Sequence, residues 1–151
     1  VKYVISLADE NSPKLKLVFQ EGETRIYENL NVLPRVFLVE EIRSLPDRQT
    51  VIDSMFNDQN KLKKIAFTEA KLFINPAPLE ATEKIEIKNY TENHIIINAS
   101  TAQERLMVLS DIYYPDWKVF INGKESTIFP VDFLLRGVIL PKNDSRIEFK
   151  I

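Results

Sequence analysis

The 151-residue sequence contains no cysteine, a single histidine and only three glycines. Without cysteine, the chain has neither disulfides nor thiolate metal sites. One histidine, His94, cannot supply a multi-histidine zinc site and leaves little for a Ser-His-Asp triad. The three glycines do not form the pattern that a phosphate loop needs. We therefore expect no catalytic residue, no metal and no cofactor in this chain.

An excess of charge of one sign is also lacking. Lysine and arginine number 20 and aspartate and glutamate 22, for a net charge of -2. Nucleic-acid binding usually needs a basic face, so we expect no nucleic-acid partner. No apolar run approaches the ~20 residues of a membrane span, and no signal peptide is visible. Because the chain begins at Val1 with the pattern of a strand, we expect it to be a segment of a longer protein.

What the sequence does have is enough apolar residues for a core, at 44%, and the first half arranges them mostly in strand patterns. Strands are expected over residues 2–7, 15–20 and 24–30, and one buried strand over 34–42. Val51, Ile52, Met55 and Phe56 follow helical spacing, which predicts a short helix over 47–57. A strand is expected over 64–69. We expect a single domain over residues 1–151, and the prolines of 75–83 mark the best candidate for a subdivision within it, into 1–80 and 81–151.

The second half alternates clearly between apolar and polar residues from position 83 to the end. Asn122-Gly123 is the strongest hairpin signal, because both central residues of a type I′ turn need positive φ. Residues 105–114 and 133–140 are apolar on both faces, as expected of buried central strands. Many short strands with turns every 8–12 residues predict a mostly β chain. We expect a two-sheet antiparallel β-sandwich, jelly-roll or Ig-like, with one or two short helices.

The segment 110–125, SDIYYPDWKVFINGKE, offers two interpretations. Tyr113, Tyr114, Asp116 and Trp117 could form a carbohydrate platform, since aromatic faces stack on sugars and carboxylates accept hydroxyl hydrogen bonds. Alternatively, Trp117 shares a strand face with the residues at 119 and 121 and belongs to the core, while the tyrosines anchor a corner. We favour the second interpretation and keep the first as a hypothesis.

Two charged residues stand inside apolar strands, Asp111 and Arg136. Burying an unpaired charge costs several kcal/mol, on the order of its desolvation penalty. We therefore predict that the two strands are neighbours and that Asp111, or else Asp132, forms a structural ion pair with Arg136. The planar fork of Arg136 would also suit a phosphate or a carboxylate ligand.

A hydrolase with two catalytic carboxylates is a further class to consider. The glutamates that could serve are common in a chain this charged, and their spacing in the sequence indicates no pair; they are Glu40, Glu41, Glu69, Glu80 and Glu83.

Two longer segments together resemble a known family. Residues 16–42 contain YEN followed by LPR, and residues 106–151 contain SD-YYP-W, NGK, RGV-LP and a closing EF. This pattern resembles the C-terminal soluble region of the YfhO-type family of bacterial multi-pass membrane proteins. The motif positions matched are Tyr113, Tyr114, Trp117, Gly123, Arg136 and Gly137. Asp116 departs from the pattern, because glycine is expected there in many relatives.

The resemblance implies a non-catalytic extracytoplasmic domain of a glycosyltransferase-like membrane protein that uses a lipid-linked sugar and acts on cell-envelope glycans. Its partners would be the membrane portion of the same polypeptide and an envelope glycan or lipid-linked sugar. Its localisation would be the cell membrane, with this domain outside. The competing hypothesis is a protein-interaction or structural β-sandwich domain without a small-molecule ligand.

Overall fold

The computed structural model describes residues 1–75 and 77–151, which form two compact units, 1–34 and 35–151. The expected division between residues 80 and 81 falls inside the second unit. The proline-rich connection is instead bound to that unit, since the backbone N–H of Ala77 donates to the carbonyl of Glu40 at 3.1 Å. Each unit is described by itself.

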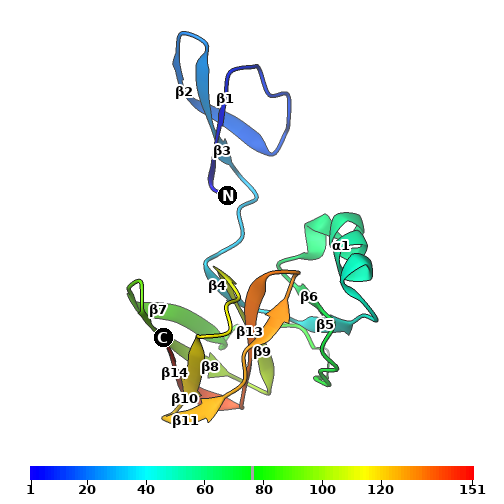
Figure 1. Cartoon of the computed structure of the whole chain (residues 1–151), viewed down its shortest axis with the longest axis vertical. Helices are drawn as coiled ribbons and strands as arrows, with labels where there is room; N and C mark the ends of the chain where they lie inside the picture. Colours follow the sequence, from blue (N-terminus) through cyan, green and yellow to red (C-terminus); the bar gives the residue numbers. More distant parts are fainter. Residues whose placement is uncertain (76) are drawn as a thin grey trace. The chain divides into compact units, whose positions relative to one another are not determined.

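The first unit is a three-stranded antiparallel sheet. Its strands are β1 (Tyr3–Ser6), β2 (Leu15–Glu21) and β3 (Thr24–Asn29), in the order β1-β3-β2 (Figure 1). Gly22, with φ of 57°, makes the tight turn between β2 and β3. Tyr27 is buried, and its hydroxyl accepts a hydrogen bond from the N–H of Glu10 at 3.1 Å. The three strands confirm the expectation for residues 2–30.

The second unit contains two larger antiparallel sheets. The five-stranded sheet has the order β11-β10-β14-β8-β7 and the four-stranded sheet the order β12-β13-β9-β4. The strands of the first are β7 (Lys84–Tyr90), β8 (His94–Thr101), β10 (Lys118–Ile121), β11 (Lys124–Ser126) and β14 (Asn143–Lys150). Those of the second are β4 (Val36–Leu38), β9 (Arg105–Ile112), β12 (Phe129–Val131) and β13 (Leu135–Leu140).

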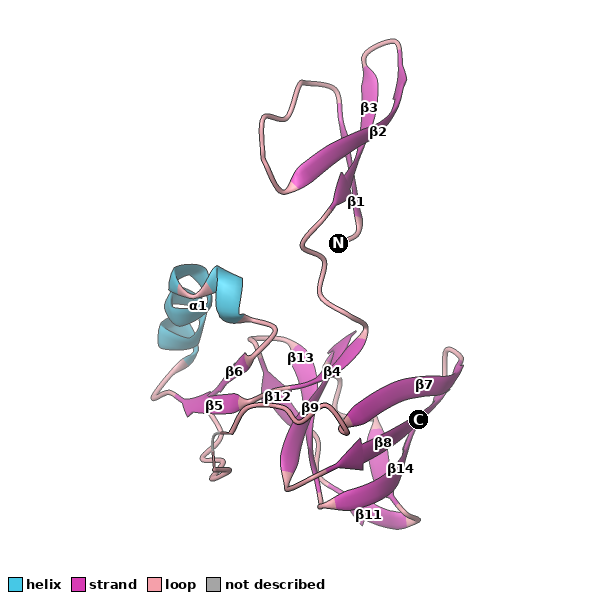
Figure 2. Ribbon diagram, turned by 180° about the vertical axis from the view of Figure 1, so that it is seen from behind, coloured by secondary structure: helices cyan, strands magenta, loops and turns pink. Residues whose placement is uncertain are grey.

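The main core lies between these two sheets. Ile95, Ile97 and Phe149 from the five-stranded sheet form one buried cluster with Met107 and Leu109 from the other sheet. Their neighbours in sequence on β9, Leu106 and Val108, are also fully buried, so both faces of this strand are covered as expected. The mostly β, antiparallel sandwich predicted from the sequence is confirmed (Figure 2).

One segment of this unit departs from the antiparallel pattern. The expected strand over 34–42 is two strands in different sheets, β4 and β5 (Glu41–Ser44), and β5 pairs in parallel with β6 (Ile65–Thr68). A parallel pair needs a crossover, which α1 (Arg48–Asn57) and the 3-10 turn η1 (Gln59–Lys61) provide. Asp47 caps α1 by accepting the N–H of Thr50 at 2.8 Å. The predicted helix is confirmed.

Two positions of the second unit require glycine for structural reasons. Asn122 and Gly123 have φ of 50° and 81° and connect β10 to β11, which confirms the predicted hairpin. Gly137 lies opposite Phe129, and a Cβ on it would be 2.7 Å from Cγ1 of Val131. The side chains of Val131 and Leu106 therefore occupy the space that a side chain at position 137 would need.

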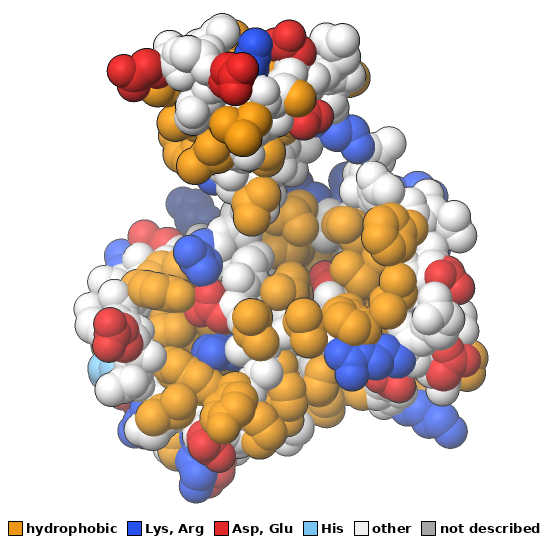
Figure 3. Space-filling view, turned by 45° about the horizontal axis from the view of Figure 1, so that its top comes forward, with side chains coloured by type: hydrophobic (Ala, Val, Ile, Leu, Met, Phe, Trp, Pro, Cys, Tyr) orange, Lys and Arg blue, Asp and Glu red, His pale blue; other side chains and the backbone are white. Residues whose placement is uncertain are grey.

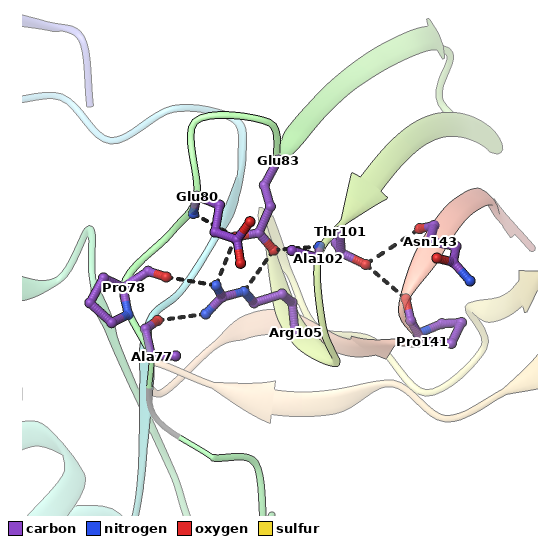
Figure 4. A network of polar contacts seen from close by, with 9 residues as sticks. All are labelled: Ala77, Pro78, Glu80, Glu83, Thr101, Ala102, Arg105, Pro141 and Asn143. Atoms are coloured by element: carbon purple, nitrogen blue, oxygen red, sulfur yellow. Dashed lines mark hydrogen bonds and ion pairs between the residues drawn. The ribbon is translucent and has the colours of Figure 1, made fainter.

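A buried ion pair fastens the connection before β7 to the start of β9. Arg105 Nη2 lies 2.7 Å from Glu83 Oε2, and both side chains are 1% exposed. The guanidinium also donates to the carbonyls of Ala77 at 2.6 Å and Pro78 at 2.8 Å, while Glu83 accepts the N–H of Ala102 at 3.0 Å (Figure 4). Every charged group in this network has partners, as a buried pair requires.

We predict that Arg105→Met lowers the free energy of unfolding by about 3–5 kcal/mol, because it leaves the Glu83 carboxylate buried without its counterion. The double variant Glu83→Gln/Arg105→Met should lose less than the sum of the two single variants. Urea unfolding followed by the fluorescence of Trp117, the only tryptophan, measures this.

Acid should weaken the same pair. Hydrogen bonds from Arg105 hold the pKa of Glu83 below its ordinary value of 4.5, so the stabilisation is present above that pH and is lost as pH falls through the lowered pKa. Glu83→Gln should reduce this dependence of stability on acid pH.

The matched control for Arg105→Met is Lys118→Met, which removes the pair of Lys118 with Glu125, whose side chains are 63% and 59% exposed. It should change the free energy of unfolding little. Equal losses for Arg105→Met and Lys118→Met would contradict the prediction.

Candidate functional site

An irregularity between β9 and β13 determines where Asp111 points. Leu135 pairs with Ile112, but the next residue, Arg136, pairs with Leu109. The β13 register therefore passes from Ile112 to Leu109, and Ser110 and Asp111 form a bulge. Bulges redirect side chains and are frequent next to binding sites. Asp111 consequently does not lie opposite Arg136, although β9 and β13 are neighbours as predicted.

A second bulge, at Lys88, places Tyr90. Ile87 pairs with Ile97, whereas Asn89 pairs with Ile96, so the register shifts by one residue. Strict alternation would put Tyr90 on the outer face of β7. After the shift Tyr90 lies opposite Ile95, a buried residue of the main core cluster. Tyr90 remains 47% exposed, but its ring now lies on the side of β7 from which its hydroxyl reaches Asp111 of the other sheet.

The two bulges border one hollow of about 600 Å³. Tyr90 and Ile95 line it from the five-stranded sheet, and Asp111 and Arg136 from the four-stranded sheet. Trp117, which precedes β10, completes the aromatic part of the lining. Apolar and aromatic walls with a few polar groups are typical of small-ligand sites. This hollow, which we call the Tyr90–Trp117 hollow, is the candidate site.

Asp111 is held by two partners. Its Oδ1 lies 2.6 Å from Nη1 of Arg35, and the Tyr90 hydroxyl is 3.0 Å from Oδ1 and 2.9 Å from Oδ2. The predicted ion pair of Asp111 with Arg136 is therefore wrong: the bulge presents the carboxylate to Arg35 instead. The alternative partner, Asp132, does not contact Arg136 either and accepts the N–H of Phe67 at 2.9 Å.

Arg136 is 5% exposed and contacts two groups. Its Nε donates to the carbonyl of Ile112 at 2.9 Å, and its guanidinium lies over the Trp117 ring, 4.2 Å from the ring centre. Nη1 is buried and has no hydrogen-bond partner among the described residues. The site thus contains a positive group whose hydrogen-bonding capacity is only partly used.

The electrostatics of the hollow follow from burial. Desolvation lowers the pKa of Arg136 below its ordinary value, an effect that the negative charge of Asp111 opposes. An arginine with a lowered pKa remains protonated at neutral pH. Burial raises the pKa of Tyr90, and the hydrogen bond to Asp111 raises it further. The phenol is therefore a neutral donor to Asp111 and not a base.

Of the four residues of the predicted carbohydrate platform, Trp117 lines the hollow. Trp117 also packs against the main core, as the interpretation of it as a core residue expects. Tyr113, Tyr114 and Asp116 are not among the residues that line the hollow. Tyr114 is 57% exposed in the turn after β9. The residues that sequence reasoning missed are Tyr90 and Arg35, and neither carries a local signal.

The glutamates considered for hydrolysis are not paired in a cleft. Glu83 is occupied by Arg105, and Glu40 lies 3.5 Å from Lys64. His94 Nε2 contacts Glu148 Oε1 at 2.6 Å across the β8–β14 pair. Within residues 1–75 and 77–151, no group of three or more potential ligands could hold a metal ion.

A second hollow, also of about 600 Å³, lies between α1 and the turn before β13. Met55, Phe56 and Leu134 contribute to an almost wholly apolar lining, and Phe56 is 68% exposed. Hydrophobic side chains also cover a broad part of the surface seen in Figure 3. Asp132 borders this hollow with a buried Oδ2 that has no partner in the described chain, and burial raises its pKa to about 7.

Comparison with known proteins adds no assignment, since no family, no curated protein and no solved structure matches the chain. No helix among the described residues is long and apolar enough to cross a membrane.

We predict that Asp132→Asn becomes increasingly stabilising relative to the wild type as pH rises from about 4 to 7. A carboxyl with a raised pKa contributes most favourably below its ordinary pKa of 3.8, and this contribution is lost as pH rises through about 7. Urea unfolding at several pH values measures the difference. Asp116→Asn, at an exposed position, is the control, and a pH-independent difference for Asp132→Asn would refute the prediction.

Proposed function

We propose that this chain is a non-catalytic, extracytoplasmic glycan-binding domain whose binding site is the Tyr90–Trp117 hollow. The observation that carries the proposal is the grouping of Tyr90, Trp117, Asp111 and Arg136 around one hollow at the end of the sandwich. Aromatic rings provide apolar contact area for a sugar, and a few fixed polar groups orient its hydroxyls. The carboxylate of Asp111 is fixed by Arg35 and Tyr90, which reduces the cost of ordering it on binding.

The same proposal places the domain outside the membrane, in a glycosyltransferase-like protein that modifies envelope glycans. Support comes from the motif resemblance in residues 16–42 and 106–151. In this role the domain would hold acceptor glycan or lipid-linked sugar near a catalytic membrane portion.

A second candidate is a protein-interaction domain, which the apolar hollow between α1 and the 132–135 turn favours. Exposed apolar surface of this kind is typical of interaction sites. The two candidates use different surfaces, so variants of Tyr90 leave the second untouched.

We predict that fragments of envelope polysaccharides bind to the intact chain and that Tyr90→Ala weakens binding at least about tenfold, the loss of ~1.4 kcal/mol expected for one ring contact. Isothermal titration calorimetry measures this. Tyr114→Ala is the matched control, because Tyr114 is an exposed tyrosine outside the hollow. Loss of binding in Tyr114→Ala alone would return the site to the platform at 113–117, and no binding by the wild type would refute the proposal.

The membrane setting makes a separate prediction. The reading frame upstream of Val1 should encode several apolar segments of about 20 residues, enough to span a bilayer. Sequencing the locus checks this, and an upstream frame without such segments would remove the membrane portion as the partner.

A further inference from the structure

Arg136 lines the Tyr90–Trp117 hollow with a guanidinium that is incompletely paired. Its Nε donates to the carbonyl of Ile112, and Nη1 is buried without a hydrogen-bond partner among the described residues. A charged donor left unpaired in the interior is costly, so such groups are rare in folded proteins. Because Nε is engaged and Nη1 has no solvent contact, Nη2 is the nitrogen that remains for an acceptor in the hollow.

The position of the guanidinium is fixed by its surroundings. It lies 4.2 Å from the centre of the Trp117 ring, and its Nε donates a hydrogen bond to the carbonyl of Ile112. Stacking on an aromatic ring and a fixed fork are the features by which arginine recognises planar anions. Because the fork is ordered before any ligand arrives, little conformational entropy is lost on binding.

The natural counterion within the fold is not available to Arg136. Asp111 is bound by Arg35 at 2.6 Å and by the Tyr90 hydroxyl, and it forms no ion pair with Arg136. Glu92, the other carboxylate that lines the hollow, is exposed in the turn between β7 and β8 and forms no ion pair within residues 1–75 and 77–151. The positive charge therefore lacks a bonded acceptor on the hollow side.

We infer that the glycan unit recognised by this hollow is an acidic sugar whose carboxylate binds the guanidinium of Arg136. The inference rests on the proposed function and specifies its substrate class. The sugar ring would contact Tyr90 and Trp117 while its hydroxyls meet Asp111. A charge-assisted hydrogen bond from the guanidinium to a carboxylate is stronger than one between neutral groups, and it gives this arginine the ionic partner that it lacks.

A carboxylate fits the charges better than a phosphate does. A phosphate monoester carries close to two negative charges at neutral pH, and the hollow offers it one guanidinium that is not already paired with a carboxylate. Arg35 is neutralised by Asp111, and both Asp111 and Glu92 would repel a dianion. One negative charge on a planar group matches one planar cation.

The test compares an oligogalacturonate with its methyl-esterified form, which has the same rings without the charge. Calorimetry on the intact chain should show that the acid binds at least tenfold more tightly than the ester. Arg136→Lys keeps the charge but not the fork and should reduce this preference to less than about threefold. Arg146→Lys, at an exposed arginine of β14, should leave it unchanged.

The outcomes separate this inference from the function on which it rests. Equal binding of acid and ester by the wild type overturns the inference while glycan binding stands, and this comparison needs no variant to fold. Tighter binding of galactose 6-phosphate than of galacturonate overturns the choice of a carboxylate. Failure of every sugar, neutral or acidic, overturns the proposed function and the inference together.

Discussion

The ion pair of Glu83 with Arg105 is the contact on which the arrangement of the larger unit depends. Glu83 precedes β7 and Arg105 opens β9, so the pair fixes the starts of two strands that belong to opposite sheets. It also gives the carbonyls of Ala77 and Pro78 a donor, which holds the incoming connection against the same point. With both side chains 1% exposed, neither strand can shift along the other without leaving a charge unpaired.

The other ends of the same two strands meet at the candidate site. Tyr90 closes β7 and Asp111 lies near the end of β9, and their hydrogen bond joins the sheets a second time. The two junctions differ in character. The Glu83–Arg105 junction is buried, and its charged groups have hydrogen-bond partners. The Tyr90–Asp111 junction borders a hollow that Arg136 also lines, and Nη1 of Arg136 has no hydrogen-bond partner among the described residues. Strands that are fixed at one end can thus present a constant geometry at the other.

Local signals in the sequence were sufficient for most of the fold. Asp47 before a helical pattern, the Asn122-Gly123 pair and the alternation after residue 83 each depend on residues close together in the chain, and each prediction was confirmed. The split of 34–42 into β4 and β5 was not predicted, because pairing partners in two different sheets decide it. The Glu83–Arg105 pair was not predicted either, because its two members are far apart in the sequence and neither stands in a local pattern.

The candidate site was harder to predict because two bulges create it. The alternation rule assigns Tyr90 to the outer face of β7 and places Asp111 opposite Arg136. A register shift in β7 turns Tyr90 to the other face. A register shift between β9 and β13 places Leu109 opposite Arg136 in place of Asp111. Only Trp117, Asp111 and Arg136 could be singled out beforehand, since a large aromatic or a charge in an apolar strand is visible in any register. Their partners, Arg35 and Tyr90, became identifiable once the register was known.

The buried charges of this unit separate structural from functional roles. Arg105 has a carboxylate and two carbonyls, which is all that a structural arginine requires. Burial raises the pKa of Asp132 to about 7, so below that pH the carboxyl is mostly neutral and no unpaired charge is buried. Arg136 can do neither: a guanidinium stays protonated, and its nearest acid is bound to Arg35. A cation that keeps its charge and lacks its counterion is best explained by an anion that arrives from outside, and the hollow it lines is the place where that anion can enter.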